Sequence, residues 1–230
     1  MSLSGLIQLV QTPYCERIGS GPFSEPLNAL TNLAFVVAAV LAARRIRDFR
    51  ELSLGTRLLP WSLGLVAVGS ALYHILRSPG TYLLDVIPLT VFIAGSLYLA
   101  LRRLAIRTSQ ALQAGAAFVL LQSVLLIFVP RHFLNGSTPY LVALLFIPLL
   151  MAWIARRYSS LVWDMVPVAV LFALALVFRT LDPVVCPWLP IGTHFLWHIS
   201  AAAAAYYLIR LVASIELASP VCCTFNVHRI

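Results

Sequence analysis

Two histidines in one apolar stretch have the spacing of a metal-binding pair. His194 and His198 are four residues apart, so on a helix both imidazoles lie on one face, one turn apart. A third histidine, His74, lies near the end of another apolar stretch. A lone histidine in such a stretch is more often a packing residue, but three neutral imidazoles with one open position form the ligand set of catalytic zinc. We therefore predict a zinc ion bound by His74, His194 and His198.

Ser70 and Asp85 are the polar residues near His74 that could take part in chemistry at a metal. Ser70 precedes His74 by one helical turn and shares its face. Its hydroxyl either reaches the metal site or fills a helix–helix contact, where small residues allow close approach. Asp85 follows a tight turn at residues 78–80. Its carboxylate either takes a proton from the zinc water or orients a ligating histidine, and both roles place it at the site.

Three further residues are candidates for support of the metal site or contact with a substrate. Glu25 and Asn28 open the first apolar stretch, and Trp197 lies between the two paired histidines. Glu25 and Asn28 either brace the zinc site, bond to the last loop, or cap the first helix, whose N-terminus favours a carboxylate. The sequence leaves these alternatives open.

The composition indicates which kind of element positions these residues. Of the 230 residues, 61% are hydrophobic and 10% are charged, and the mean hydropathy is +0.93. A soluble domain has about 25% charged residues, so an ordinary soluble fold is excluded. All 16 basic residues are arginine, and the absence of lysine excludes a retinal-binding protein or a Schiff-base enzyme. The arginines form short clusters between apolar runs, so the net charge of +8 indicates membrane orientation and no nucleic-acid partner.

Seven apolar stretches are long enough to cross a bilayer, which takes about 20 residues on a helix. They cover residues 26–45, 58–76, 83–101, 109–130, 139–155, 162–181 and 191–213. We therefore predict an all-α integral membrane protein with a bundle of seven transmembrane helices. We expect an extracytoplasmic segment, 1–25, before this seven-helix transmembrane domain, 26–213, and a cytoplasmic tail, 214–230, after it.

Arginine counts predict the orientation of the bundle. Twelve arginines lie in the loops on one side and at the C-terminal end, whereas four lie on the other side. The four are Arg17, Arg77, Arg131 and Arg179. The positive-inside rule then places the N-terminus outside and the C-terminus in the cytoplasm, with the histidines toward the exterior.

The cysteines divide into two pairs across the membrane. Cys15 and Cys186 both fall on the predicted exterior side, where an oxidising compartment permits a disulfide, and we predict that they bond. Cys222 and Cys223 fall in the cytoplasmic tail, as reduced thiols or as acylation sites.

The N-terminal segment and four aromatic residues allow further predictions about where the chain meets the membrane surface. Residues 1–21 lack a basic n-region and do not indicate a cleaved signal peptide. They could form a short amphipathic surface helix. Four aromatic residues are expected at the membrane interfaces. They are Tyr82, Tyr140, Trp163 and Trp188.

At these residues the chain resembles the alkaline ceramidase family, within a larger group of heptahelical membrane hydrolases that includes the adiponectin-receptor-like proteins. The resemblance spans nearly the whole chain. Its motifs are Cys15-Glu16, Glu25-x-x-Asn28-x-x-x-Asn32, Ser70-x-x-x-His74, Asp85, Asp182-x-x-x-Cys186 and His194-x-x-Trp197-His198.

The resemblance implies an intramembrane zinc held by the three histidines, with Asp85 activating the water and Ser70 binding that water or the oxyanion. It also implies the Cys15–Cys186 disulfide and a substrate such as ceramide, hydrolysed to a sphingoid base and a fatty acid. The eukaryotic members of this family look to have a calcium site built from acidic and amide groups just before and within the first span, and Glu16 and Glu25 are such groups in this chain. Here Pro13 and Ile18 stand where oxygen donors are expected, which argues against calcium.

Together these features predict a zinc-dependent amidohydrolase acting on ceramide or a related N-acyl lipid in the membrane. The all-arginine composition indicates a GC-rich bacterial genome, hence the bacterial plasma membrane with the site on its extracytoplasmic side. The alternatives are a haem protein, or a non-catalytic receptor or metal transporter of the same fold. The sequence carries no signal for the oligomeric state.

Overall fold

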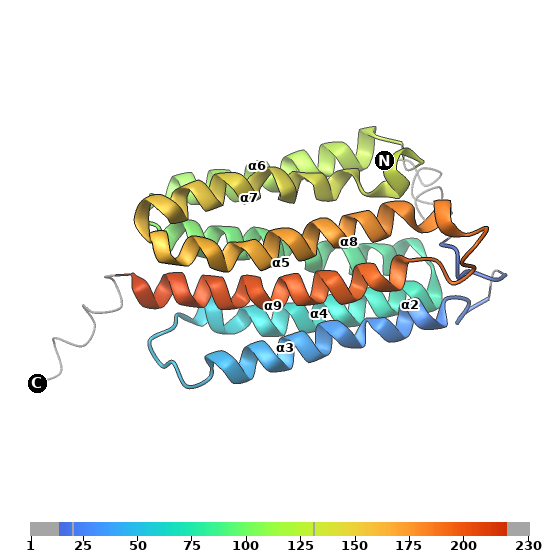
Figure 1. Cartoon of the computed structure of the whole chain (residues 1–230), viewed down its shortest axis with the longest axis horizontal. Coiled ribbons are helices and arrows are strands. Elements are labelled where there is room, and N and C mark those ends of the chain that lie inside the picture. Colours follow the sequence, from blue (N-terminus) through green and yellow to red (C-terminus); the bar gives the residue numbers. More distant parts are fainter. Residues whose placement is uncertain (1–13, 20, 131, 220–230) are drawn as a thin grey trace, which may run out of the picture.

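The chain folds into a bundle of long, roughly parallel helices (Figure 1). This computed structural model describes residues 14–19, 21–130 and 132–219. Within these ranges the helices are α2 (Pro26–Thr31), α3 (Leu33–Ile46), α4 (Leu54–Leu76), α5 (Pro79–Arg103), α6 (Thr108–Phe128), α7 (Thr138–Arg157), α8 (Met165–Val185) and α9 (His194–Ala218). Two short 3-10 helices, η1 (Phe133–Gly136) and η2 (Ser159–Asp164), precede α7 and α8.

In the described part of the chain, seven helical segments are long and apolar enough to cross a membrane, which confirms the predicted architecture. The first segment comprises α2 and α3, which are interrupted at Asn32, and the sixth runs from η2 through α8. Large apolar side chains face outward along the helices, as a lipid-exposed surface requires. The last helix begins at His194 and continues past the predicted boundary at residue 213 to Ala218.

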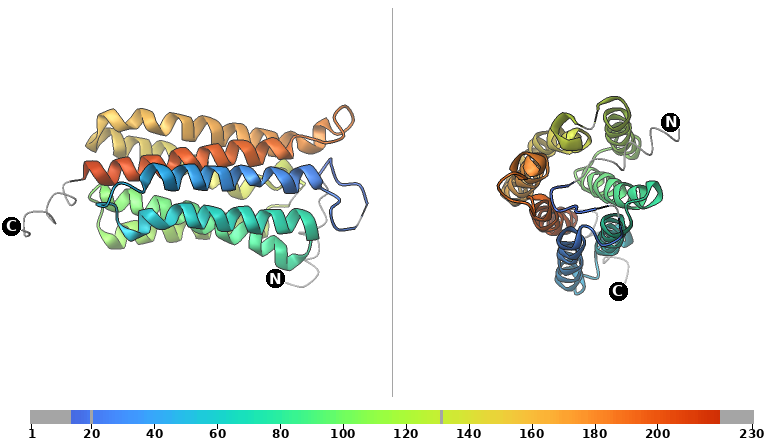
Figure 2. Two further views of the ribbon diagram at one scale, coloured as in Figure 1. Left: turned by 90° about the horizontal axis from the view of Figure 1, so that it is seen from below. Right: turned by 90° about the vertical axis from the view of Figure 1, so that its right-hand side faces the viewer.

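Helix α9 is the most enclosed of these segments. Within the apolar 18-residue stretch of α9 that qualifies it as a membrane span, 56% is buried. The corresponding share in α6 is 17%. Four alanines between residues 201 and 205 are at most 6% exposed, and their small side chains let neighbouring helices approach closely. The end view in Figure 2 shows the helices arranged around the bundle axis, with the chain before α2 crossing that end.

Helices α4 and α5 pack unusually closely where the site lies. A Cβ atom at Gly69 would lie 1.8 Å from the carbonyl oxygen of Leu84 and 3.4 Å from the backbone nitrogen of Asp85. Only glycine fits such a contact. This approach brings the start of α5, with Asp85, against the stretch of α4 that carries Ser70 and His74.

The turn between α4 and α5 is set by a capping box. The Ser78 hydroxyl accepts a hydrogen bond from the Thr81 nitrogen, and the Thr81 hydroxyl accepts one from the Ser78 nitrogen. Pro79 occupies the first helical turn, where its missing N–H costs nothing. Helix α5 therefore begins four residues before the predicted span at residue 83.

A buried carboxylate joins three helices at the opposite end of the bundle. Glu216 of α9 is 1% exposed. It accepts hydrogen bonds from the Ser53 nitrogen (2.7 Å) and the Thr56 hydroxyl at the start of α4, and it pairs with Arg103 of α5 at 2.6 Å. This network fixes the far end of α9, and sequence reasoning did not single it out.

Several predictions concern the ends of the chain and the interface aromatics. The amphipathic helix proposed near the N-terminus and the cysteines at 222 and 223 lie outside the described residues. Trp163 and Trp188 are more than 70% exposed, as interface residues are. Tyr82 and Tyr140 are buried, so their assignment to the interface was wrong. They pack inside the bundle near the histidines.

Candidate metal centre

The three histidines converge inside the bundle, at the end where the chain enters α2. His74 comes from the last turns of α4, and His194 and His198 come from the first turns of α9. Each is 1% exposed, and one ligand nitrogen from each lies within 4.8 Å of the others. This is the spatial arrangement that the spacing of the histidines predicted, and it forms a candidate metal centre.

Two of the histidines are oriented by side chains from α2 and its N-cap. Glu25 Oε2 accepts a hydrogen bond from His74 Nδ1 at 2.6 Å, and Thr31 Oγ1 lies 2.9 Å from His198 Nδ1. Hydrogen bonds to one ring nitrogen leave the other for a metal, and a carboxylate partner raises the basicity of the ligating imidazole. Sequence reasoning missed Thr31, because nothing in its local pattern shows that it faces α9.

The unpartnered nitrogens of the cluster fit a metal ion. His198 Nε2 and His194 Nδ1 are buried and have no hydrogen-bond partner among the described residues. Buried polar atoms are rarely left unpaired, since each costs about 1–3 kcal/mol. Three imidazoles and no thiolate in the cluster are a donor set that suits zinc with an open fourth position.

Glu25 is the charged centre behind His74. It is fully buried, and its Oε1 lies 3.0 Å from Arg17 Nη1 and 3.4 Å from Arg77 Nε. Burial raises the pKa of Glu25. The hydrogen bond and charge of His74, the charge of Arg77 and the hydrogen bond from Arg17 together lower it by more, so the pKa falls below the usual 4.5. The carboxylate is therefore ionised at neutral pH.

The capping role considered for Glu25 belongs instead to Glu16. Glu25 stands at the N-cap of α2 but its side chain makes no capping bond. The two carboxylate oxygens of Glu16 accept hydrogen bonds from the backbone nitrogens of Leu27 and Asn28. Both carboxylates that sequence reasoning weighed for calcium thus have protein partners.

Asp182 anchors the start of α9 and the segment before α2. Its Oδ1 accepts hydrogen bonds from the Thr193 and His194 nitrogens at 2.8 and 2.9 Å, and its Oδ2 accepts one from the Cys15 nitrogen at 3.1 Å. Gly192 has φ +66°, and a Cβ there would lie 2.1 Å from Asp182 Oδ1. Cys15 is bonded to Cys186, with Cα atoms 5.2 Å apart, which confirms the predicted disulfide.

Tyr14 lies in the segment before α2 that the Cys15–Cys186 disulfide holds in place. Its ring covers the three-histidine cluster. Its ring stacks on His194 with centroids 3.7 Å apart and an interplanar angle of 18°. The guanidinium carbon of Arg77 lies 5.1 Å from the centroid of the same ring. Arg77 and Arg179 were counted as loop arginines, but both are 9% exposed. They belong to the interior of the site.

Ser70, Asp85 and Asn28 are not among the three clustered ligand residues. Ser70 is 4% exposed, and Asp85 is partly exposed and is not one of the clustered ligand residues. Neither side chain has a hydrogen-bond partner among the residues that the structure describes. Asn28 is fully buried, and both polar atoms of its amide lack a partner in the same part of the chain. These three groups remain available to water or a ligand.

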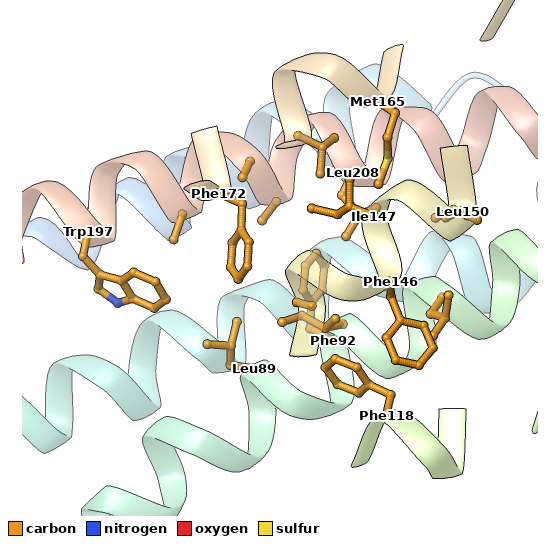
Figure 3. Close-up of a pocket in the computed structure, with 17 residues that line it drawn as sticks. Leu89, Phe92, Phe118, Phe146, Ile147, Leu150, Met165, Phe172, Trp197 and Leu208 are labelled. Atoms are coloured by element: carbon orange, nitrogen blue, oxygen red, sulfur yellow. The ribbon is translucent and has the colours of Figure 1, made fainter. Parts of the chain in front are cut away.

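An apolar cavity of about 90 Å³ extends from Trp197 into the bundle (Figure 3). Trp197 lies next to His198 in the sequence, and its indole packs 5.1 Å from the ring of Tyr140. Figure 3 shows Trp197 at one end of the lining and Leu150 and Met165 at the other. The lining is apolar and comes from α5, α6, α7, α8 and α9. Such a space suits a hydrocarbon chain.

The fold and the site define a class of protein: a heptahelical membrane protein with a buried three-histidine cluster beside an apolar cavity. A sequence model of one family, described as ceramidase, matches residues 11–220, which is most of the chain. The chain therefore belongs to the ceramidase family. No curated protein sequence matches it. Family membership supports a membrane hydrolase that acts on the amide bond of a lipid.

Proposed function

We propose that the protein is a zinc-dependent amidohydrolase that cleaves ceramide or a related N-acyl lipid to an amine and a fatty acid. The observation that carries the proposal is the buried cluster of His74, His194 and His198, two of which are held by oxygen partners. When bound there, zinc supplies Lewis acidity toward the amide carbonyl and a water of lowered pKa. The orientation of the site toward the exterior follows from the arginine counts and belongs to the same proposal.

The protein's own groups supply proton transfer and oxyanion binding in this proposal. Asp85 takes the proton of the attacking water on its carboxylate and returns it to the departing amine. Ser70 donates a hydrogen bond to the oxyanion of the tetrahedral intermediate. The close contact of α4 and α5 at Gly69 supports both roles, because it brings Asp85 beside the turn of α4 that carries Ser70 and His74.

The cavity supports an acyl lipid as substrate. The scissile amide must reach the histidines while the acyl chain leaves water. Trp197 borders the cavity and precedes the ligating His198. An acyl chain lying along the cavity places the carbonyl of its amide near the three-histidine cluster. Desolvation of the chain contributes about 0.8 kcal/mol per methylene group to binding.

The first test counts zinc in the purified protein and measures amide hydrolysis. Wild type is expected to hold about one zinc per chain, and the His194→Ala/His198→Ala variant none. Asp85→Asn is expected to keep the metal and lose at least 100-fold in turnover, since general base catalysis contributes about 10²–10⁴-fold. Wild-type turnover by Asp85→Asn would remove Asp85 from the mechanism. Zinc binding without hydrolysis of any N-acyl lipid would instead favour a non-catalytic receptor.

A further inference from the structure

Arg179 carries a buried positive charge that the proposed mechanism does not use. It lies on α8 and is 9% exposed. Its guanidinium carbon is 5.1 Å from the ring centroid of Tyr140, 5.3 Å from that of Trp197 and 5.8 Å from that of Tyr14. Three aromatic rings thus surround the charge. Cation–π contacts of this kind contribute about 0.5–2 kcal/mol each.

The guanidinium has no hydrogen-bond acceptor in the described part of the chain. Its Nε is buried and unpartnered, and no carboxylate there forms an ion pair with it. A guanidinium has five N–H donors, and burying a charge without paired partners costs several kcal/mol. Aromatic faces offset only part of that cost.

The guanidinium lies near one residue that contacts the histidine cluster and near another that lines the apolar cavity. Trp197 contacts Arg179 on one side and borders the cavity. Tyr14 lies within 5.8 Å of the same guanidinium and stacks on His194 at 3.7 Å. A lipid whose chain fills the cavity therefore presents its polar end to Arg179. An anionic oxygen pair at that position supplies the acceptors that the guanidinium lacks.

We propose that Arg179 binds the carboxylate of an acyl lipid whose hydrocarbon chain occupies the cavity. A planar guanidinium accommodates a carboxylate through two parallel N–H···O bonds. Two sources share this chemistry. One is the free fatty acid released by the hydrolysis, and the other is an N-acyl amino acid with a carboxylate in its head group. The assignment of the fatty acid as a product rests on the proposed function, whereas carboxylate binding itself does not.

Equilibrium binding to the full-length protein in detergent micelles tests the site directly. The probes are dodecanoic acid and dodecan-1-ol at pH 8, which have the same chain length and differ in charge. Wild type is expected to bind the acid at least tenfold more tightly than the alcohol. Arg179→Gln is expected to abolish this preference, and Arg179→Lys to keep part of it, because a lysine retains the charge but loses the bidentate geometry.

Two controls separate the site from other causes. Arg210→Gln changes an arginine on α9 that also lies over aromatic rings, those of Tyr206 and Tyr207, and it is expected to leave the preference intact. The measurement is repeated after treatment with a zinc chelator, and the preference is expected to persist. Equal binding of acid and alcohol by wild type, an unchanged preference in Arg179→Gln, or loss of the preference on chelation would each overturn the proposal.

N-dodecanoylglycine and N-dodecanoylethanolamine then distinguish the two sources. If the head group is the source, the glycine conjugate binds or turns over at least tenfold better than the neutral ethanolamide, and Arg179→Gln removes the difference. If the product is the source, the two amides behave alike and only the free acid depends on Arg179. Preference for the acid without hydrolysis of any amide would retain the carboxylate site and reject the proposed function.

Discussion

At the scale of single residues, Glu25 is the negative charge that supports the three-histidine cluster. Its carboxylate is fully buried, accepts a hydrogen bond from His74, and pairs with Arg17 and Arg77. We expect Glu25→Gln to weaken zinc binding by about 10–100-fold, as loss of a partner of a ligating histidine commonly does. The amide also leaves Arg17 and Arg77 without their negative charge, so the free energy of unfolding should fall by about 3–5 kcal/mol. Titration with a competing chelator measures the first effect and thermal unfolding the second.

Asp48→Asn is the matched control for that change. It makes the same carboxylate-to-amide replacement at a side chain that is 79% exposed and that pairs with Arg47, which is 72% exposed. We expect it to alter neither zinc affinity nor stability measurably. Wild-type zinc affinity in Glu25→Gln would show that the carboxylate does not support the metal ligand.

The sequence could predict the histidines but not all of their surroundings. Ionisable residues are so costly in apolar segments that spacing alone draws attention to His74, His194 and His198. Arg179 is just as costly, yet near the end of a span it resembles a loop charge. Thr31 and Tyr140 have ordinary sequence contexts. Their roles depend on which face of each helix meets its neighbours, and average hydropathy carries no information on that.

At the scale of helices, the contact between α4 and α5 positions the catalytic candidates. Gly69→Ala would place a methyl group 1.8 Å from the carbonyl oxygen of Leu84. The backbone cannot move aside cheaply, so α4 and α5 must separate. We expect a loss of about 1–3 kcal/mol or more in stability and a marked loss of hydrolysis. Thermal unfolding and turnover of a ceramide substrate measure these effects.

Gly64→Ala provides the comparison within the same helix. A Cβ at Gly64 meets nothing within 4 Å, so the change should shift stability by no more than about 1 kcal/mol. Equal behaviour of the two variants would mean that the close approach at Gly69 is unimportant for the site.

The spans themselves could be predicted closely, because the bilayer imposes their length through about 20 apolar residues. Their ends could not. Helix α5 begins early because of the Ser78–Thr81 capping box, and α9 begins late because Gly192 and Asp182 shape the preceding turn. These are local polar contacts that hydropathy averages out.

At the scale of the whole molecule, each end of the bundle is held by a separate polar network. Glu216 joins α4, α5 and α9 at one end, and Asp182 with the Cys15–Cys186 disulfide joins α8, α9 and the segment before α2 at the other. We expect Cys15→Ser/Cys186→Ser to lower the free energy of unfolding by about 2–5 kcal/mol. Zinc retention should fall as well, since Tyr14 is no longer tethered over His194. Unchanged unfolding and zinc content would limit the disulfide to a passive role.

The disulfide also provides a test of orientation. A disulfide persists in an oxidising compartment, and arginine counts place Cys15 and Cys186 outside and Cys222 and Cys223 in the cytoplasm. In intact bacterial spheroplasts, a membrane-impermeant maleimide should therefore label no cysteine of the chain. After an impermeant reductant, it should label Cys15 and Cys186, and only permeabilisation should expose Cys222 and Cys223. Mass spectrometry of the labelled peptides identifies each site. Labelling of Cys222 and Cys223 in intact spheroplasts would invert the topology and place the metal cluster on the cytoplasmic side.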